Sequence, residues 1–152
     1  KEKHFKSLKH GVDNKVNTIR MFQAILLAGT EMASPETRKK FKLTTKYRVI
    51  TGAVGKYQFG DKNIPVCEIE EIIVGTNTLS EKDYLECRVM NLFVTTFYNN
   101  SLFYEIYAML RSIGASCFDC LIYMIEHTEL YSDKIKKITK KNTKLRIISR
   151  LT

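Results

Sequence analysis

The sequence predicts an α+β fold, and three observations support this. Helical spacing of apolar residues begins near the first residue, where Phe5, Leu8 and Val12 fall on one face. Residues 47–74 are rich in β-type side chains and are broken by glycines, which indicates strands joined by turns. From Ser80 onward the apolar residues return to helical spacing. Helices therefore lie on both sides of a β-rich middle.

The composition is that of an ordinary globular protein. Of 152 residues, 44% are apolar and 27% are charged. No apolar run approaches the roughly 18 residues that a membrane-spanning helix needs, and the first residues form no apolar leader. We therefore expect a cytoplasmic protein with no membrane span.

Residues 16–27 form a mostly apolar run whose periodicity is ambiguous. Read as a strand, it carries apolar residues on both faces. That pattern is typical of a parallel strand covered on each side, which needs neighbouring strands and helices. The chain offers few of these, and its first residue is Lys1 rather than Met. We therefore expect a segment of a longer polypeptide, in which residues 16–27 are an interior strand.

The next elements have clear local signals. Ser34 followed by Pro35 predicts the start of a short helix that ends near Lys42, because a hydroxyl can cap the helix and proline suits its first turn. The turn-like residues 60–63 divide the β-rich stretch into two or three strands, most simply a hairpin.

Three helices are expected after the strands. The first begins at Ser80 and stops at Asn99 and Asn100. The second is capped by Ser101 and ends at Gly114, and the third is capped by Ser116.

The net charge of +9 is concentrated at the two ends of the chain. Residues 1–48 carry twelve basic and four acidic groups, whereas residues 49–132 carry five basic and eleven acidic groups. A fourth, weaker helix is expected from Ser132, and it carries Lys134, Lys136, Lys137, Lys140, Lys141, Lys144, Arg146 and Arg150. We interpret this tail as a solvated terminal helix. The alternative is a stand-alone basic module that binds nucleic acid through this helix, although no aromatic residue follows Tyr131 to stack on bases.

The four cysteines are expected to be reduced thiols. Cys117 and Cys120 are one helical turn apart, so they suit a redox pair or half a zinc site completed by Cys67, Cys87 or His127. Buried helical cysteines are the favoured interpretation, because free cysteine is among the most buried residue types.

Several short sequence segments occur in an order that resembles a known family. They lie at residues 24–33 (AILLAGTEMA), 34–41 (SPETRKKF), 45–50 (TKYRVI), 68–74 (EIEEIIV), 76–80 (TNTLS), 83–88 (DYLECR) and 97–99 (FYN). Together they resemble the region late in the barrel, and the segment after it, of radical SAM enzymes that carry an N-terminal cobalamin-binding domain. The resemblance covers roughly residues 1–114.

This resemblance implies the edge of a (β/α) barrel at residues 1–50, followed by an accessory region at 51–152 with a small β hairpin and a C-terminal helical bundle. It implies a parent enzyme that cleaves S-adenosylmethionine (SAM) reductively with a [4Fe-4S] cluster and forms a radical on a small-molecule substrate, with cobalamin as a possible second cofactor. The chain departs from the family in two places. Ala28 stands where proline usually precedes Gly-Thr, and the family's Cys-x-x-x-Cys-x-x-Cys spacing is absent from these residues.

The resemblance also places candidate site residues after the expected barrel strand, at the end where barrel enzymes hold their sites. Gly29 and Thr30 are expected near SAM, with Gln23 and Glu31 near substrate. The alternative is that Gly29 only makes a tight turn and Glu31 only faces solvent.

Arg88 is a further candidate for substrate binding. An ion pair is the favoured alternative, because several carboxylates lie within reach in the sequence: Glu68, Glu70, Glu71 and Glu86. Glu70 and Glu71 are not expected to form a catalytic dyad, because adjacent residues of a strand point to opposite faces.

Overall fold

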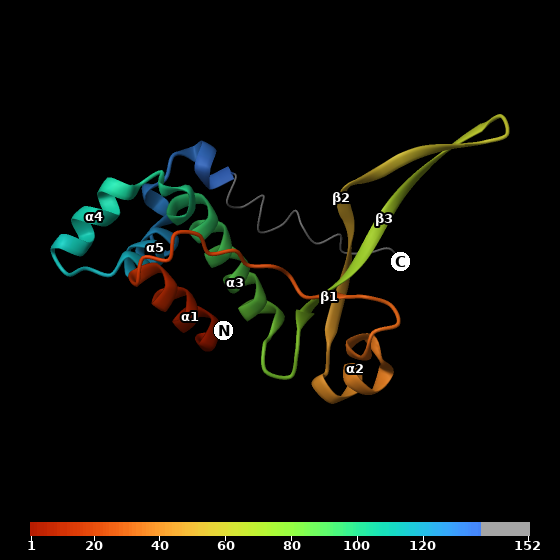
Figure 1. Ribbon diagram of the computed structural model, residues 1–152, viewed down its shortest axis with the longest axis horizontal. Helices are drawn as coiled ribbons and strands as arrows, with labels where there is room; N and C mark the ends of the chain where they lie inside the picture. Colours follow the sequence, from red (N-terminus) through yellow and green to blue (C-terminus); the bar gives the residue numbers. More distant parts are fainter. Residues whose placement is uncertain (138–152) are drawn as a thin grey trace. The chain divides into compact units, whose positions relative to one another are not determined.

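The structure is a computed structural model that describes residues 1–137, with residue 51 described by its backbone alone. It confirms the α+β class, with helices and an antiparallel sheet. The described chain divides into two compact units (Figure 1). Residues 1–22 and 82–137 form the helix unit, and residues 23–81 form the sheet unit. The boundary predicted near residue 50 falls inside strand β2 (Thr44–Phe59).

The sheet unit is built on a long antiparallel hairpin, as the turn signal predicted. Strand β2 returns as β3 (Lys62–Gly75), and the short strand β1 (Ile25–Leu26) pairs with the other edge of β3. The ladder closes at the turn, where Phe59 pairs with Lys62. Figure 1 shows β2 and β3 running together beyond β1, so the distal part of the hairpin is two-stranded.

The long parallel strand predicted over residues 16–27 is wrong. Only Ile25 and Leu26 are in a strand, and they pair antiparallel with Ile72 and Glu71 of β3. The physical reason is that a parallel interior strand needs a partner on each side, and β3 offers one free edge because β2 occupies the other. The described residues cover this run unevenly: Leu26 is buried and Ile19 and Met21 pack against the helix core, whereas Phe22 is 86% exposed.

A bulge interrupts the hairpin between Val49 and Val54. Pairing passes from Val49 opposite Ile69 to Val54 opposite Cys67, so β2 advances further than β3 across this interval. Gly52 has a φ of +87° here, a conformation that glycine adopts without the steric penalty of a β-carbon. Glycine at position 52 therefore allows the bulge to form without a large cost in free energy.

Replacing Gly52 by alanine should destabilise the sheet unit by about 1–2 kcal/mol, because an L side chain is strained at positive φ. Space is not the cause, since an added β-carbon would meet no atom within 4 Å. Gly55→Ala is the matched control: Gly55 lies in the same strand without positive φ, and its β-carbon would make ordinary contact with Tyr57. Urea unfolding followed by circular dichroism measures both, and equal losses would contradict the strain explanation.

The helix that follows β1 forms as its local sequence predicted. Helix α2 (Pro35–Phe41) is capped by Ser34, whose Oγ accepts a hydrogen bond from the Thr37 amide at 3.2 Å. A short 3-10 turn, η1 (Glu31–Ala33), precedes it. Lys42 ends the helix with a φ of +49°.

The helix unit contains α1 (Glu2–Asp13), α3 (Glu81–Phe93), α4 (Tyr104–Ser112) and α5 (Cys117–Glu126). Shorter turns extend α3 and follow α5: η2 (Val94–Tyr98), η3 (Asn99–Ser101) and η4 (Thr128–Leu130). These elements share one apolar core of Leu8, Val12, Met90, Val94, Tyr98, Tyr107, Cys117, Phe118 and Leu121.

One predicted cap in this unit is right and another is wrong. The Ser116 Oγ accepts the Asp119 amide at 3.1 Å and starts α5 as expected. Ser101 does not cap α4, which begins at Tyr104 without a side-chain cap. Asn100 and Ser101 both have positive φ, so the chain turns sharply before a helix can start.

Two sequence expectations concern the end of the chain and the membrane. Residues 133–137 are helical, and the rest of the predicted terminal helix lies outside the described residues. Within residues 1–137, no one helix has both the length and the apolar character to cross a membrane. The bent pair α4 and α5, at 114° to each other, meets that test of length and composition when taken together.

Candidate functional site

Three of the predicted site residues lie together in an exposed turn directly after β1. Gly29 has a φ of +80°, and a β-carbon there would meet no atom within 4 Å, so the space beside it is open. The amide and hydroxyl of Thr30 both donate to the Leu27 carbonyl, at 3.2 and 2.7 Å. Glu31 begins η1 and is exposed. The turn at residues 28–31, which we call the GTE turn, therefore presents a glycine, a hydroxyl and a carboxylate to solvent.

Arg38 ties the segment after the GTE turn to the sheet. Its Nε donates to the Ala33 carbonyl at 3.0 Å, and its two Nη atoms donate to the Glu71 carboxylate at 2.7 and 2.6 Å. The Thr45 hydroxyl donates to the same carboxylate at 2.5 Å. This planar, two-pronged pair fixes both position and angle, so α2 and η1 are held against β3. Sequence reasoning missed Arg38, because its partner lies 33 residues away.

The surroundings of the Glu71 carboxylate favour its ionised form. Its side chain is only 13% exposed. The Arg38 guanidinium, with help from Thr45, holds the pKa of Glu71 below its usual value of 4.5, although burial opposes this shift. Glu71 is therefore an anchor for Arg38 and has no proton to exchange near neutral pH.

Gln23 is also held by the sheet. Its Oε1 accepts from the Arg48 guanidinium, which also donates to Glu70 directly across the ladder. Glu70 and Glu71 thus have separate sets of partners, as expected for neighbours on opposite faces of a strand. Gln23 has a structural partner at the position where the sequence predicted contact with substrate.

Arg88 belongs to the helix unit, on α3, whereas the other four predicted residues belong to the sheet unit. Three of the carboxylates predicted to pair with it have other cationic partners. Glu70 pairs with Arg48, Glu71 with Arg38, and Glu86 with Lys1. The predicted pairing of Arg88 with these three carboxylates is therefore replaced by other ion pairs.

The cysteines do not fit a metal or cluster site. Cys87 and Cys117 are buried, Cys120 is half-buried and Cys67 is exposed. Burial raises the pKa of Cys87, Cys117 and Cys120, which disfavours the thiolate form that metals and clusters require. No group of three or more potential metal ligands is assembled by residues 1–137. Cys117 is a core residue, as the packing interpretation predicted.

Comparison with known proteins leaves the function to be argued from these residues. No family model matches the chain, and a search of curated proteins finds no significant match. The features with a chemical interpretation are therefore the GTE turn, the Arg38–Glu71 pair that supports it, and a polar pocket in the helix unit.

Proposed function

We propose that this chain is part of a radical SAM enzyme of the cobalamin-domain type, where it forms the late edge of the barrel and the helical region after it. The GTE turn is its contribution to the SAM and substrate pocket. The observation that carries the proposal is the open turn of Gly29 and Thr30 directly after an apolar run in which the described residues leave Phe22 and Leu27 exposed. The order of the sequence segments that resemble the radical SAM family supports the same assignment.

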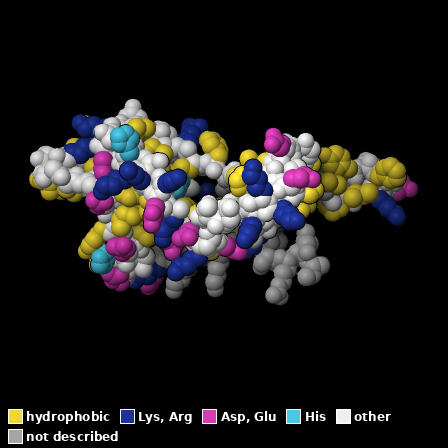
Figure 2. Space-filling view, turned by 90° about the horizontal axis from the view of Figure 1, so that it is seen from below, with side chains coloured by type: hydrophobic (Ala, Val, Ile, Leu, Met, Phe, Trp, Pro, Cys, Tyr) yellow, Lys and Arg dark blue, Asp and Glu magenta, His cyan; other side chains and the backbone are white. Residues whose placement is uncertain are grey.

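Uncovered apolar surface is the first support. Phe22 and Leu27 flank β1 and are 86% and 62% exposed. The distal hairpin adds further exposed apolar side chains: Val54, Tyr57, Phe59, Ile64 and Val66. Figure 2 shows hydrophobic side chains gathered along this projecting end. Because contiguous apolar surface of this kind marks an interaction site, the proposal assigns it to the remainder of the parent enzyme.

The chemistry of the turn is the second support. Gly29 lets a ligand approach the backbone closely, since no side chain stands in the way. The Thr30 hydroxyl donates to Leu27 and keeps lone pairs that can accept from an amino or hydroxyl group. Arg38 and Glu71 act as positioning residues, because they hold the segment after the turn and do not line it.

The iron–sulfur cluster is assigned to residues outside this chain. The cysteines of this chain lack the family spacing, and most of them are buried. Burial raises the pKa of the Cys117 thiol, which does not suit a cluster ligand. In the proposed enzyme the cluster would supply the electron that cleaves SAM, and this chain would help to bind and orient SAM and the substrate.

The test uses the full encoded polypeptide that contains these residues, produced and reconstituted without oxygen. We expect bound iron and release of 5′-deoxyadenosine from SAM. Gly29→Val should raise the KM for SAM by about tenfold, as expected when one good contact worth about 1.4 kcal/mol is lost. Absence of iron, or of SAM cleavage, from the full polypeptide would refute the proposal.

The matched control is Gly60→Val in the hairpin turn. Gly60 also has a positive φ, +59°, and open space around it, so the two substitutions impose comparable backbone strain. Only Gly29→Val should alter the KM for SAM. Equal changes would mean that the GTE turn acts through stability alone.

The alternative of a basic module that binds nucleic acid has less support. Most of the basic tail lies outside the described residues, which include Lys134, Lys136 and Lys137 only. No observation on the described residues favours this function over the radical SAM assignment.

A further inference from the structure

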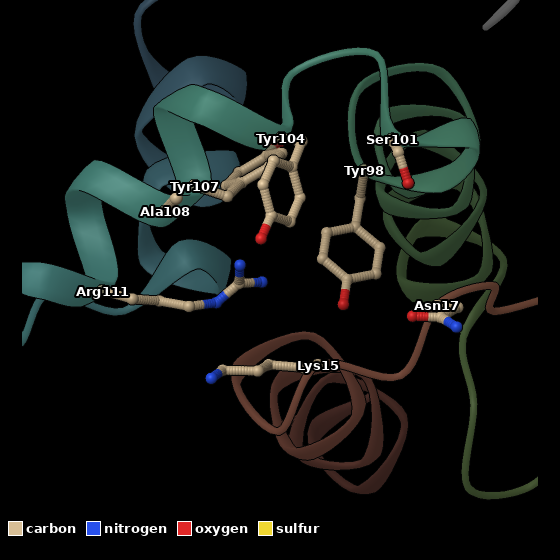
Figure 3. A pocket seen from close by; sticks show the side chains of 8 residues that line it. All are labelled: Lys15, Asn17, Tyr98, Ser101, Tyr104, Tyr107, Ala108 and Arg111. Carbon is tan, nitrogen blue, oxygen red and sulfur yellow. The ribbon is translucent and has the colours of Figure 1, made fainter.

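The helix unit contains a polar pocket that the proposed function does not use. It has a volume of about 330 Å³ and is lined by α4, by the turn after α1 and by the turns at the end of α3. Tyr104, Tyr107 and Arg111 reach it from one face of α4, where their spacing of three and four residues aligns them. Lys15 and Tyr98 face them (Figure 3). The volume is at the lower end of the range typical for small-molecule sites.

Two cations that have no anionic partner among the described residues converge on this pocket. Figure 3 shows the Arg111 guanidinium and the Lys15 ammonium pointing into the same space, beside the Tyr104 hydroxyl. No residue that lines the pocket is acidic. Within residues 1–137, neither Lys15 nor Arg111 forms an ion pair. Burial raises the pKa of Tyr98 and Tyr107, so these phenols stay neutral and add no negative charge to the pocket.

Arg111 also has an unsatisfied donor. Its Nε is buried and has no hydrogen-bond partner among the described residues. Buried polar groups are nearly always paired, so a lone donor of this kind indicates a missing partner such as a bound anion. The Arg111 guanidinium carbon lies 6.0 Å from the centre of the Tyr107 ring, which limits where the side chain can move.

The backbone around the pocket is strained. Lys15 has a φ of +62° and Ser101 a φ of +55°, and both line the pocket. Non-glycine residues in this conformation cost free energy and cluster at functional sites. Lysine at position 15 therefore occupies a place where glycine would fit more easily.

We propose that this pocket binds a dianionic phosphate group, either inorganic phosphate or the phosphate of a small organic monoester. Arg111 and Lys15 provide two positive charges for the two negative charges, and the Tyr104 hydroxyl donates a further hydrogen bond. A phosphate monoester is largely dianionic at neutral pH, and the arginine fork suits its tetrahedral oxygens. The remaining volume and the tyrosine rings suit a small organic group. This inference does not depend on the radical SAM proposal.

The test is calorimetric titration of the whole chain at constant ionic strength with inorganic phosphate, phenyl phosphate and benzenesulfonate. We expect one site for phenyl phosphate, weaker binding of inorganic phosphate, and binding of the monoanionic sulfonate weaker by about tenfold. Arg111→Gln should weaken phenyl phosphate binding by about tenfold to a hundredfold, which is the usual effect of losing a charged hydrogen bond. Failure of the unaltered chain to bind either phosphate at millimolar concentration would overturn the proposal.

Lys15→Gly keeps the test decisive if Arg111→Gln folds poorly. It removes the ammonium at a positive φ that glycine prefers, so Tm should stay the same or rise while phenyl phosphate binding weakens by about tenfold. The matched control is Lys42→Gly, which has the same charge change and a positive φ of +49° at the end of α2, outside the pocket. If both variants weakened phenyl phosphate binding equally, net charge alone would explain the effect, and binding in this pocket would be refuted.

Discussion

Replacing Arg38 by methionine should measurably destabilise the sheet unit at pH 7. The Glu71 carboxylate is largely buried and would lose a two-pronged partner. Removing one partner of such a pair leaves the other charge without compensation, although solvent around the partly exposed Arg38 moderates the effect. Urea unfolding measured by circular dichroism gives the change.

The effect of Arg38→Met should depend on pH with a definite sign. The pKa of Glu71 is lowered in the folded state, so the pair stabilises fully above the unfolded pKa and less as pH falls through the lowered value. In Arg38→Met the pKa of Glu71 should rise towards 4.5 or above. The gap in unfolding free energy between the variant and the unaltered chain should therefore be largest at neutral pH and shrink at pH 3.

Lys39→Met is the control for that experiment, because Lys39 is a neighbouring exposed cation on α2. It should change stability by less than about 0.5 kcal/mol, as exposed substitutions usually do. If Lys39→Met cost as much as Arg38→Met, or if the gap did not vary with pH, Glu71 would not be the group that Arg38 stabilises.

Replacing Asn99 by alanine should destabilise the helix unit by about 2–4 kcal/mol. Asn99 is 5% exposed, and its side chain accepts from the Ile19 amide at 3.0 Å and donates to the Ile19 carbonyl at 2.9 Å. Alanine would leave both backbone groups of Ile19 without partners, and each unsatisfied buried group costs about 1–3 kcal/mol. Hydrogen exchange at the Ile19 amide should become faster than in the unaltered chain.

The neighbouring Asn100→Gly should have the opposite sign. Asn100 has a φ of +66°, so glycine should relieve strain and change stability by between zero and about +1 kcal/mol. Two adjacent asparagines with opposite effects would show that the Asn99 side chain, and not the turn itself, holds Ile19 on the helix unit. Equal destabilisation by both variants would contradict this role.

The candidate site was only partly predictable from sequence. The resemblance identified Gly29, Thr30 and Glu31, and the structure brings them into one exposed turn. The residues that anchor the segment after this turn were missed, because Arg38 and Glu71 meet across 33 residues and neither carries a local signal. The pocket residues of α4 do share a spacing of three and four residues, but charge and aromatic residues on one helix face are common and do not by themselves indicate a cavity.

Sequence alone determined the elements whose stability is local. Two helix starts are set by Ser34 and Ser116, whose hydroxyls each accept a hydrogen bond from the amide three residues later. The turn at Gly60 sets the hairpin. Tertiary structure decided the rest. Residues 16–27 have apolar side chains suited to a strand, yet a strand forms only where a partner offers free backbone groups. Strand β3 pairs with Ile25 and Leu26, and its Ile73 amide also donates to the Ala24 carbonyl at 3.0 Å. Ile19 in the same run is held by Asn99, through hydrogen bonds that span 80 residues and obey no local pattern.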